Sequence, residues 1–431
     1  MDYRRSLRWL DELVAFGIKT GTGHTRIISG ELGDPHLKFP SVLVGGTNGK
    51  GSTCSCLESI LRHSGYRTGL FTSPHLVDIR ERIAVGGEPI PGRLFAEAVS
   101  DVRMAYSRLE KRGSLDEKPT FFEALTLAAF RIFAKEKIDI AVVEVGMGGG
   151  KDCTNILEPV ISVVTNASLD HQQYLGRTLD EIALEKAGIF RKGRPALIGK
   201  TSDRTEKILA GEAYRIGAEI RLMSAGKLTR KGGGFAFQKG KKELLFPKPF
   251  LPGKHQVDNT ALAVLTAREL GKLGFEIGAD SVREGVQKCR WRGRLEKISS
   301  MPDVFLDGAH NIDGIRTLKR FVEGLSGKKV LVFSVMKDKP AEKMAGILAP
   351  FFEEIILTEI PMNRAAKRED LEELLEKDKY SFISEPMKAL EKAKFSARNT
   401  GTVIVAGSLY LVGYILKNFE QREGTAWGTG L

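Results

Sequence analysis

Residues 45–53 carry the residue types that bind a nucleoside triphosphate. They read Gly-Gly-Thr-Asn-Gly-Lys-Gly-Ser-Thr, follow a β-branched run at 41–44 and precede apolar residues at helical spacing. Glycines let successive N–H groups turn toward one anion, and a helix N-terminus adds positive potential. A lysine adds a mobile charge, and a serine hydroxyl suits Mg²⁺. The pattern predicts phosphate binding by Thr47, Asn48, Gly49, Lys50, Gly51, Ser52 and Thr53, with Ser52 also a Mg²⁺ ligand.

This loop departs from the common form G-x-x-x-x-G-K-[ST]. Val44 stands where that form has its first glycine, and Gly51 separates Lys50 from Ser52. A plain glycine turn joining strand to helix is the alternative, but packing gives no reason for Gly-Lys-Gly-Ser at this point. The chain has no Asn-Lys-x-Asp guanine motif, so ATP is the expected nucleotide.

Two further strand ends carry groups that bind metals. Glu144 ends the apolar run 138–145 and precedes four glycines within 146–150, and His171 follows the apolar run 159–166. Because the carboxyl ends of parallel strands meet at one edge of a sheet, both side chains are expected at the same crevice. Mg²⁺ prefers oxygen, so Glu144 is the expected ligand, whereas imidazole is an unusual one. A solvent-facing glutamate and a structural histidine are the alternatives.

Short motifs spread along the chain resemble those of the Mur ligase superfamily, and within it the folylpolyglutamate synthases and their bifunctional dihydrofolate synthase forms. Each motif is weak alone, but eight occur in the family's order between residues 45 and 413. They lie at 46–52, 72–76, 169–171, 185–189, 255–259, 292–296, 307–311 and 407–413.

The resemblance implies roles for several residues that would otherwise be assigned to turns or exposed helix surfaces. Ser73 and His171 are implied as metal ligands in a site with two Mg²⁺ ions, and Lys186 as a carbamylated lysine that holds Mg²⁺. Lys50, Lys186 and His310 are the implied catalytic residues. Contacts to ATP are implied for Asn259 (adenine), Arg294 (phosphate), Asp307 (ribose) and His310 (phosphates).

The reaction implied by this resemblance is ATP-driven amide formation. A substrate carboxylate attacks the γ-phosphate to give an acyl phosphate and ADP, and the amino group of L-glutamate then displaces phosphate. Such chemistry depends on positioning and on neutralising charge, here by Lys50, the two Mg²⁺ ions and His310. The acceptor is a folate, and dihydropteroate is a second candidate.

The folate assignment depends on two segments. Thr120 and Phe122 match a family segment near the pterin, and Asp152 and Cys153 match another; ordinary core packing is the alternative for the aromatic residues. The chain has Gly150 where the family has Arg, Cys153 where it has Ala, and Arg292 where it has Pro. These departures spare the ATP and metal positions and bear on the pteridine pocket and the preferred folate form.

Two other functions remain open. A ligase that adds an amino acid to a cell-wall precursor belongs to the same superfamily, but about forty residues before the loop leave no room for the usual extra N-terminal domain. A nucleotide-binding homologue with an altered substrate is the other. An assay for ADP release with each acceptor separates the three.

Alternating strands and helices predict an α/β fold with a mainly parallel sheet. We expect a P-loop ATP-binding domain at 1–293 and a Rossmann-like C-terminal domain at 297–431. Short segments broken by glycines at 219–252 predict a small antiparallel sheet. Residues 1–40 predict a short helix, a Gly/Thr-rich loop and a connector.

Composition is that of a globular protein, with 42% hydrophobic and 28% charged residues among 431. No apolar run approaches the roughly 18–20 residues of a membrane span, and the N-terminus lacks the core of a signal peptide, so a cytoplasmic location is expected. The family resemblance implies a monomer. The four cysteines fit no zinc site. A net charge of +12 is dispersed without interleaved aromatics, which favours acidic small molecules over nucleic acid.

Overall fold

The computed structural model describes residues 1–374 and 380–423, in which the strands form three sheets. Residues 375–379 and 424–431, both within the predicted C-terminal domain, lie outside the described part. The α/β class, the mainly parallel sheet and the small antiparallel sheet predicted from the sequence are confirmed. Within the described residues, no helix has the length and apolar character needed to cross a membrane.

Sheet A has eight strands, and only the second in its order runs opposite to the others. Its order is β4 (Glu88–Pro89), β3 (Ile83–Val85), β2 (Thr68–Phe71), β5 (Ile140–Glu144), β1 (Ser41–Gly45), β6 (Ile161–Val164), β7 (Pro195–Ile198) and β8 (Glu219–Leu222).

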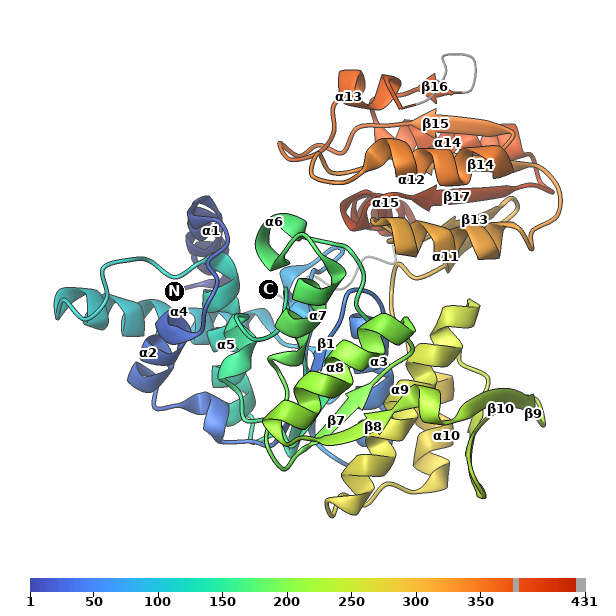
Figure 1. Ribbon diagram of the computed structural model, residues 1–431. Helices are drawn as coiled ribbons and strands as arrows, with labels where there is room; N and C mark the ends of the chain where they lie inside the picture. The colour runs from blue at the N-terminus through green and yellow to red at the C-terminus, as the bar shows by residue number, and fades with distance from the viewer. Residues whose placement is uncertain (375–379, 424–431) are drawn as a thin grey trace.

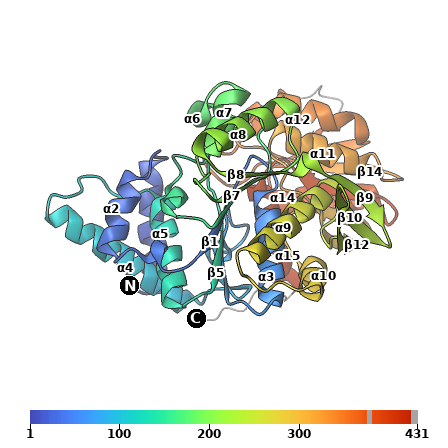
Figure 2. The same ribbon diagram turned by 60° about the horizontal axis from the view of Figure 1, so that its bottom comes forward.

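The central strands of sheet A are apolar on both faces. Leu43 and Val143 point into one core, and Val42 and Val142 point into the other. Helices cover both faces, as a buried parallel sheet requires. The first core contains α1 (Tyr3–Leu13), α2 (Gly23–Glu31), α4 (Gly92–Lys111), α5 (Phe121–Lys135), α7 (Leu179–Ala187) and α8 (Asp203–Ile216). The second contains α3 (Lys50–His63), α9 (Lys254–Lys272) and α10 (Ala279–Lys288), which lie side by side (Figure 2).

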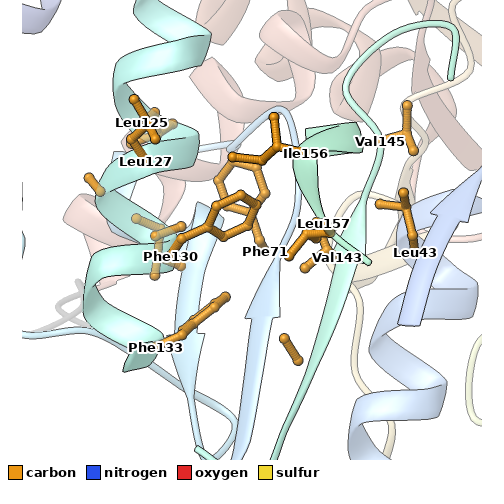
Figure 3. Close-up of a cluster of buried hydrophobic side chains, with 14 of the residues drawn as sticks. Leu43, Phe71, Leu125, Leu127, Phe130, Phe133, Val143, Val145, Ile156 and Leu157 are labelled. Carbon is orange, nitrogen blue, oxygen red and sulfur yellow. The ribbon is translucent and has the colours of Figure 1, made fainter. Parts of the chain in front are cut away.

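The first core is rich in aromatic side chains. Figure 3 shows Phe71 of β2 and Phe130 of α5, both members of this core, in the region between the helix and the strands. All ten residues labelled there are buried. This packing fixes α5 and the edge of β2 against β5, and both elements lead into the site described below.

Two local predictions needed correction. Residues 23–31 form α2 rather than a loop and connector, because Ile28 is buried in the first core and holds the segment as a helix. Residues 219–222 form β8 of sheet A rather than a hairpin strand. The antiparallel sheet is therefore shorter than predicted and consists of β9 (Lys227–Lys231), β10 (Gly234–Lys239) and β11 (Lys242–Pro247).

Sheet C is built from the C-terminal part of the chain. Its order is β12 (Glu296–Ser300), β13 (Asp303–Leu306), β17 (Thr402–Ala406), β14 (Lys329–Phe333), β15 (Glu354–Leu357) and β16 (Ser381–Phe382), and β12 alone among these six is antiparallel. One face packs on α14 (Pro386–Ala397) and α15 (Leu409–Glu423). The other packs on α11 (Ile312–Val322), α12 (Ala341–Leu348) and α13 (Arg368–Glu372). Figure 1 shows this orange-to-red layer lying apart from sheet A.

Candidate functional site

A cavity of about 1540 Å³ lies between sheets A and C. It is lined by the residues that follow β1, β2, β5 and β6 and by those that follow β13, β14 and β17. The carboxyl edges of two parallel sheets therefore face one space, which is where α/β proteins place their ligands. Every residue predicted for the site lines this cavity except Thr53.

The loop before α3 is held in shape by residues that follow β6. Asn166 accepts the Thr47 N–H through its carbonyl at 3.0 Å and the Asn48 N–H through its side chain at 3.0 Å. Gly49 has φ +84°, which favours glycine, and a Cβ there would collide with the side chain of Asn259. The loop thus reaches the N-terminus of α3 in a fixed conformation, and its residues 46–52 line the cavity.

Thr53 departs from the prediction. It is the fourth residue of α3, and the helical turn places it inside the protein, fully buried, with its N–H donating to the Gly49 carbonyl at 2.9 Å. Its Oγ1 has no hydrogen-bond partner among the described residues. Thr53 therefore has no exposed atom with which to contact ATP, whereas Ser52 lines the cavity.

Glu144 lines the cavity and is 4% exposed. One carboxylate oxygen accepts the Ser73 N–H at 3.1 Å, and the other lies 3.9 Å from Lys50 Nζ. Burial raises the pKa of Glu144, while Lys50 and the Ser73 N–H act in the opposite direction. A buried carboxylate with one nearby cation is a site that a further positive charge would stabilise.

The donor set around Glu144 fits Mg²⁺ and not a metal that requires a protein cage. Among the described residues, no group of three or more His, Cys, Asp or Glu side chains could enclose a metal ion. Mg²⁺ usually keeps several waters and takes one or two carboxylates together with substrate phosphates. Glu144, the hydroxyls of Ser52 and Ser73 and the imidazole of His171 all line the same cavity and would complete such a shell.

Lys186 is buried in α7, and no hydrogen bond of its ammonium group occurs among the described residues. Burial lowers the pKa of Lys186 to about 7, and the charge of Lys50 acts in the same direction. Lys186 is not an exposed lysine on a helix surface, because it is 3% exposed and lines the cavity.

On the opposite wall, Asp307 and His310 follow β13. The Asp307 carboxylate accepts the N–H groups of Leu295 at 3.0 Å and Ala309 at 2.9 Å, so it also braces the chain where sheet C begins. His310 Nδ1 donates to the Gly308 carbonyl at 2.8 Å, which leaves Nε2 as the free ring nitrogen. Burial lowers the pKa of His310 to about 4. The imidazole is therefore neutral near pH 7 in this structure, where the sequence predicted a neutralising charge.

The residues predicted for the pterin line the same cavity. Thr120 caps α5 and accepts the Glu123 N–H at 3.2 Å, and the Phe122 ring stacks on Phe71 with centroids 5.8 Å apart. The buried Asp152 carboxylate accepts the Met147 N–H at 2.9 Å, and burial raises its pKa. Cys153 is 7% exposed and lies 3.3 Å from a Thr126 hydroxyl.

The departures from the family pattern have structural counterparts. A Cβ at Gly150 would lie 3.3 Å from the Gly188 backbone, so this glycine packs closely on the end of α7. Arg292 does not line the cavity; it binds Glu296 of β12 and Glu420 of α15 and so ties the connection between the sheets to sheet C.

The sequence did not predict a group of four residues that connects the sheet A side of the site to the sheet C side. Lys339 Nζ binds Asp170 at 2.9 Å, and both side chains are about nine-tenths buried. Asn311 donates to the other Asp170 oxygen at 3.1 Å and to the Asn48 side chain at 3.0 Å. Burial raises the pKa of Asp170, but His171 and Lys339 outweigh it and lower the pKa below its usual range. Asp170 and Asn311 lie in the motifs at 169–171 and 307–311, but the sequence does not show that these segments meet Lys339.

We expect Asp170→Asn to lower the free energy of unfolding by about 3 kcal/mol, because it removes the closer carboxylate from the buried Lys339 ammonium and leaves it only Asp338, at 3.8 Å. The double variant Asp170→Asn/Lys339→Met should recover part of this loss. Thermal and urea denaturation measure both. The exposed pair Lys297–Asp303 is the control, and Asp303→Asn there should cost less than about 1 kcal/mol. Equal losses in the single and double variants would contradict the pairing.

Comparisons with known proteins show the family of the chain. The model of the Mur ligase middle domain matches residues 44–267, and that of the Mur ligase glutamate ligase domain matches residues 293–409. The chain is 32% identical over 428 residues to the dihydrofolate synthase/folylpolyglutamate synthase of Bacillus subtilis, covering 97% of this chain and 99% of that one.

Solved structures give the same result. E. coli FolC in complex with DHPP and ADP matches with a TM-score of 0.88 and 29% identity over 97% of this chain and 98% of that one. A bifunctional folylpolyglutamate synthase/dihydrofolate synthase with Mn, AMPPNP and L-glutamate bound matches with a TM-score of 0.85 and 28% identity over 96% and 98%. The chain therefore belongs to the Mur ligase family, among its folylpolyglutamate and dihydrofolate synthases.

Proposed function

We propose that this protein uses ATP to join L-glutamate to a folate through an amide bond, and that it also accepts dihydropteroate. The observation that carries the proposal is the single cavity, in which the phosphate-binding loop and Glu144 face the predicted pterin residues and sheet C. A volume of about 1540 Å³ exceeds the roughly 300–1,000 Å³ of a pocket for one small molecule, so several reactants fit together.

In the first step, an oxygen of the acceptor carboxylate attacks the γ-phosphorus of ATP. The bond from that phosphorus to the β–γ bridging oxygen breaks, and ADP leaves with the electron pair. Lys50 and Arg294 bind the phosphates, the loop at 47–52 orients them, and Asn259 contacts adenine. Ser52, Ser73, Glu144 and His171 would hold two Mg²⁺ ions, and these would supply positive charge near the phosphate oxygens.

In the second step, the amino group of L-glutamate attacks the acyl carbon and inorganic phosphate leaves. The amine must lose a proton as the amide forms. The departing phosphate can take this proton. His310 would contact that phosphate through Nε2, because its Nδ1 proton is held by the Gly308 carbonyl. Asp307 contacts the ribose beside it.

We further propose that Lys186 carries a carbamate that contributes an anionic oxygen to the metal shell. Only a neutral amine attacks CO₂, and a pKa of about 7 leaves about half of the Lys186 side chains neutral near pH 7. The cavity-facing position gives CO₂ access.

With ¹³C-bicarbonate, the protein is expected to show a carbamate carbon signal by NMR that is absent in Lys186→Met. The signal should weaken as the pH falls below 7, because the protonated ammonium does not react. Lys151→Met, which alters an exposed lysine on the same cavity, should keep it. A signal that survives Lys186→Met would contradict the assignment.

The two-domain organisation is part of the same proposal. Residues 1–293 and 297–431 would close on the reactants about the connection at 292–294 and exclude water. We propose that the protein works as a monomer in the cytoplasm and that its partners are ATP, L-glutamate and the folate or dihydropteroate acceptor.

Mass spectrometry of the products tests the function, with dihydropteroate and tetrahydrofolate offered in parallel together with ATP and L-glutamate. The expected products are each acceptor plus one glutamate residue, with ADP formed in equal amount. The cell-wall alternative loses support, since the relatives and structures reported above are folate ligases. ADP formed only with a cell-wall precursor, or with no acceptor at all, would overturn the proposal.

A further inference from the structure

Arg82 is a buried cation on the cavity wall. It ends the 3-10 helix Ile79–Arg82, directly before β3, and is 9% exposed. Its carbonyl accepts the Thr72 N–H at 3.0 Å, which places it beside the loop that carries Ser73. The side chain lines the cavity. Burial lowers the pKa of Arg82 to about 10, so it is charged at neutral pH.

Protein groups satisfy only part of the hydrogen-bonding capacity of this guanidinium group. Nε donates to His75 Nδ1 at 2.8 Å, and burial lowers the pKa of His75 to about 3, so that ring is a neutral acceptor. The guanidinium carbon lies 5.3 Å from the centroid of the Phe121 ring. In the described part of the chain, no carboxylate lies within ion-pair distance of Arg82, and its two terminal nitrogens make no hydrogen bond.

Arg80, two residues earlier, shows what a structural arginine does here. Its Nε and Nη2 bind both oxygens of Asp78, at 3.0 and 2.9 Å, and it does not line the cavity. Glu81, between the two, uses its carboxylate on the N–H groups of Leu76, Val77 and Asp78. The segment therefore has two carboxylates, and neither pairs with Arg82.

A buried guanidinium with unused N–H groups is costly unless a ligand completes it. Its two terminal nitrogens form a fork that matches the two oxygens of a carboxylate or phosphate. Arg82 stands between the predicted pterin segment, through Phe121, and Glu144, with which it interacts electrostatically. The anion expected here is therefore a carboxylate that lies between the pterin end of the substrate and the γ-phosphate of ATP.

We propose that Arg82 binds the acceptor carboxylate of the folate or pteroate substrate and holds it toward the γ-phosphate. The inference rests on the proposed function and adds a catalytic residue to it. The same fork remains in contact when that carboxylate becomes the acyl phosphate, since the product keeps oxygens at the same positions. ATP itself has Lys50 and the loop N–H groups, so it does not need Arg82.

Dihydropteroate is the informative acceptor, because it has one carboxylate and a contact to a second one cannot explain the result. Arg82→Met should lower kcat/KM for dihydropteroate by about 100-fold, the loss expected for charge-assisted hydrogen bonds to an ionic group. Arg82→Lys should restore part of it, and added guanidinium ion should raise the rate of Arg82→Met. The affinity for AMPPNP, measured by calorimetry, should stay within twofold of wild type and shows that the variants fold.

Arg80→Met is the matched control, and we expect kcat/KM for dihydropteroate there to stay within about threefold of wild type, as for a partly exposed pair. The inference is overturned if Arg82→Met keeps its kcat/KM, or if AMPPNP binding falls in parallel with it, which would indicate a structural role. A wild-type protein that glutamylates neither dihydropteroate nor tetrahydrofolate would overturn the proposed function and this inference together. A wild type that does so, with an equally active Arg82→Met, would overturn the inference alone.

Discussion

Replacing Lys50 by methionine is expected to lower kcat for ADP formation by about 1000-fold, the loss seen when one preorganised electrostatic group is removed from a transition state. Lys50 begins α3, its Nζ lies 3.3 Å from the Thr47 carbonyl and 3.9 Å from Glu144, and the side chain is 17% exposed. Its charge is therefore fixed in the cavity rather than free in solvent, and it can follow the transferred phosphoryl group. Steady-state assays with saturating acceptor and L-glutamate measure the effect.

Two comparisons make the Lys50 result specific. Lys297→Met, in an exposed ion pair on β12, should leave kcat unchanged. Lys50→Arg keeps the charge but not the shape, so its rate should lie between wild type and Lys50→Met. A Lys50→Met protein that hydrolyses or transfers phosphate at the wild-type rate would remove the phosphate-binding loop from the mechanism.

Glu144→Gln is expected to reduce the rate of ADP formation about 1000-fold at low Mg²⁺ concentration and less at high Mg²⁺ concentration. The reason is that the substitution removes the buried negative charge that would bind the metal ion. Glutamine keeps the shape and still offers an oxygen to the Ser73 N–H, which Glu144 accepts at 3.1 Å. Titration of ADP formation against Mg²⁺ concentration separates lost metal affinity from lost structure.

The buried carboxylate of Glu58 is the control for Glu144. It lies 4% exposed in α3 and accepts from the Thr68 hydroxyl and Arg62, away from the cavity. Glu58→Gln should lower thermal stability without changing the Mg²⁺ concentration needed for half-maximal rate. If both variants shift the Mg²⁺ dependence equally, Glu144 is not a ligand.

Local patterns predicted those parts of the site that follow a single strand. Glu144 and the loop at 45–53 each depend on one strand and the residues after it, so alternation and glycine content were sufficient. Thr53 shows the limit within an element: the loop motif extends through it, but the turn of α3 carries its side chain inside. The likeness to known motifs, rather than spacing, supplied His171, Lys186 and His310.

Contacts between distant segments could not be predicted. Lys339 and Asp170 lie 169 residues apart, and Asn48 and Asn311 lie 263 apart. No periodicity links such pairs; they depend on how sheets A and C face each other. Arg82 was missed for a related reason, because an arginine in a loop gives no sign that its counter-ion is absent. The domain limits at 293 and 297 and the roles of the site residues stay predictions.

The amide pair between Asn48 and Asn311 joins the phosphate-binding loop to the cap of α11 on the other sheet. A ligand that orders this loop would also strengthen the contact between the parts of the protein built on sheets A and C. By thermodynamic linkage, a stronger contact would in turn favour binding of that ligand. The thermal stability of the protein then depends on whether nucleotide is bound. Cellular nucleotide concentrations would therefore set how long a molecule resists proteolysis.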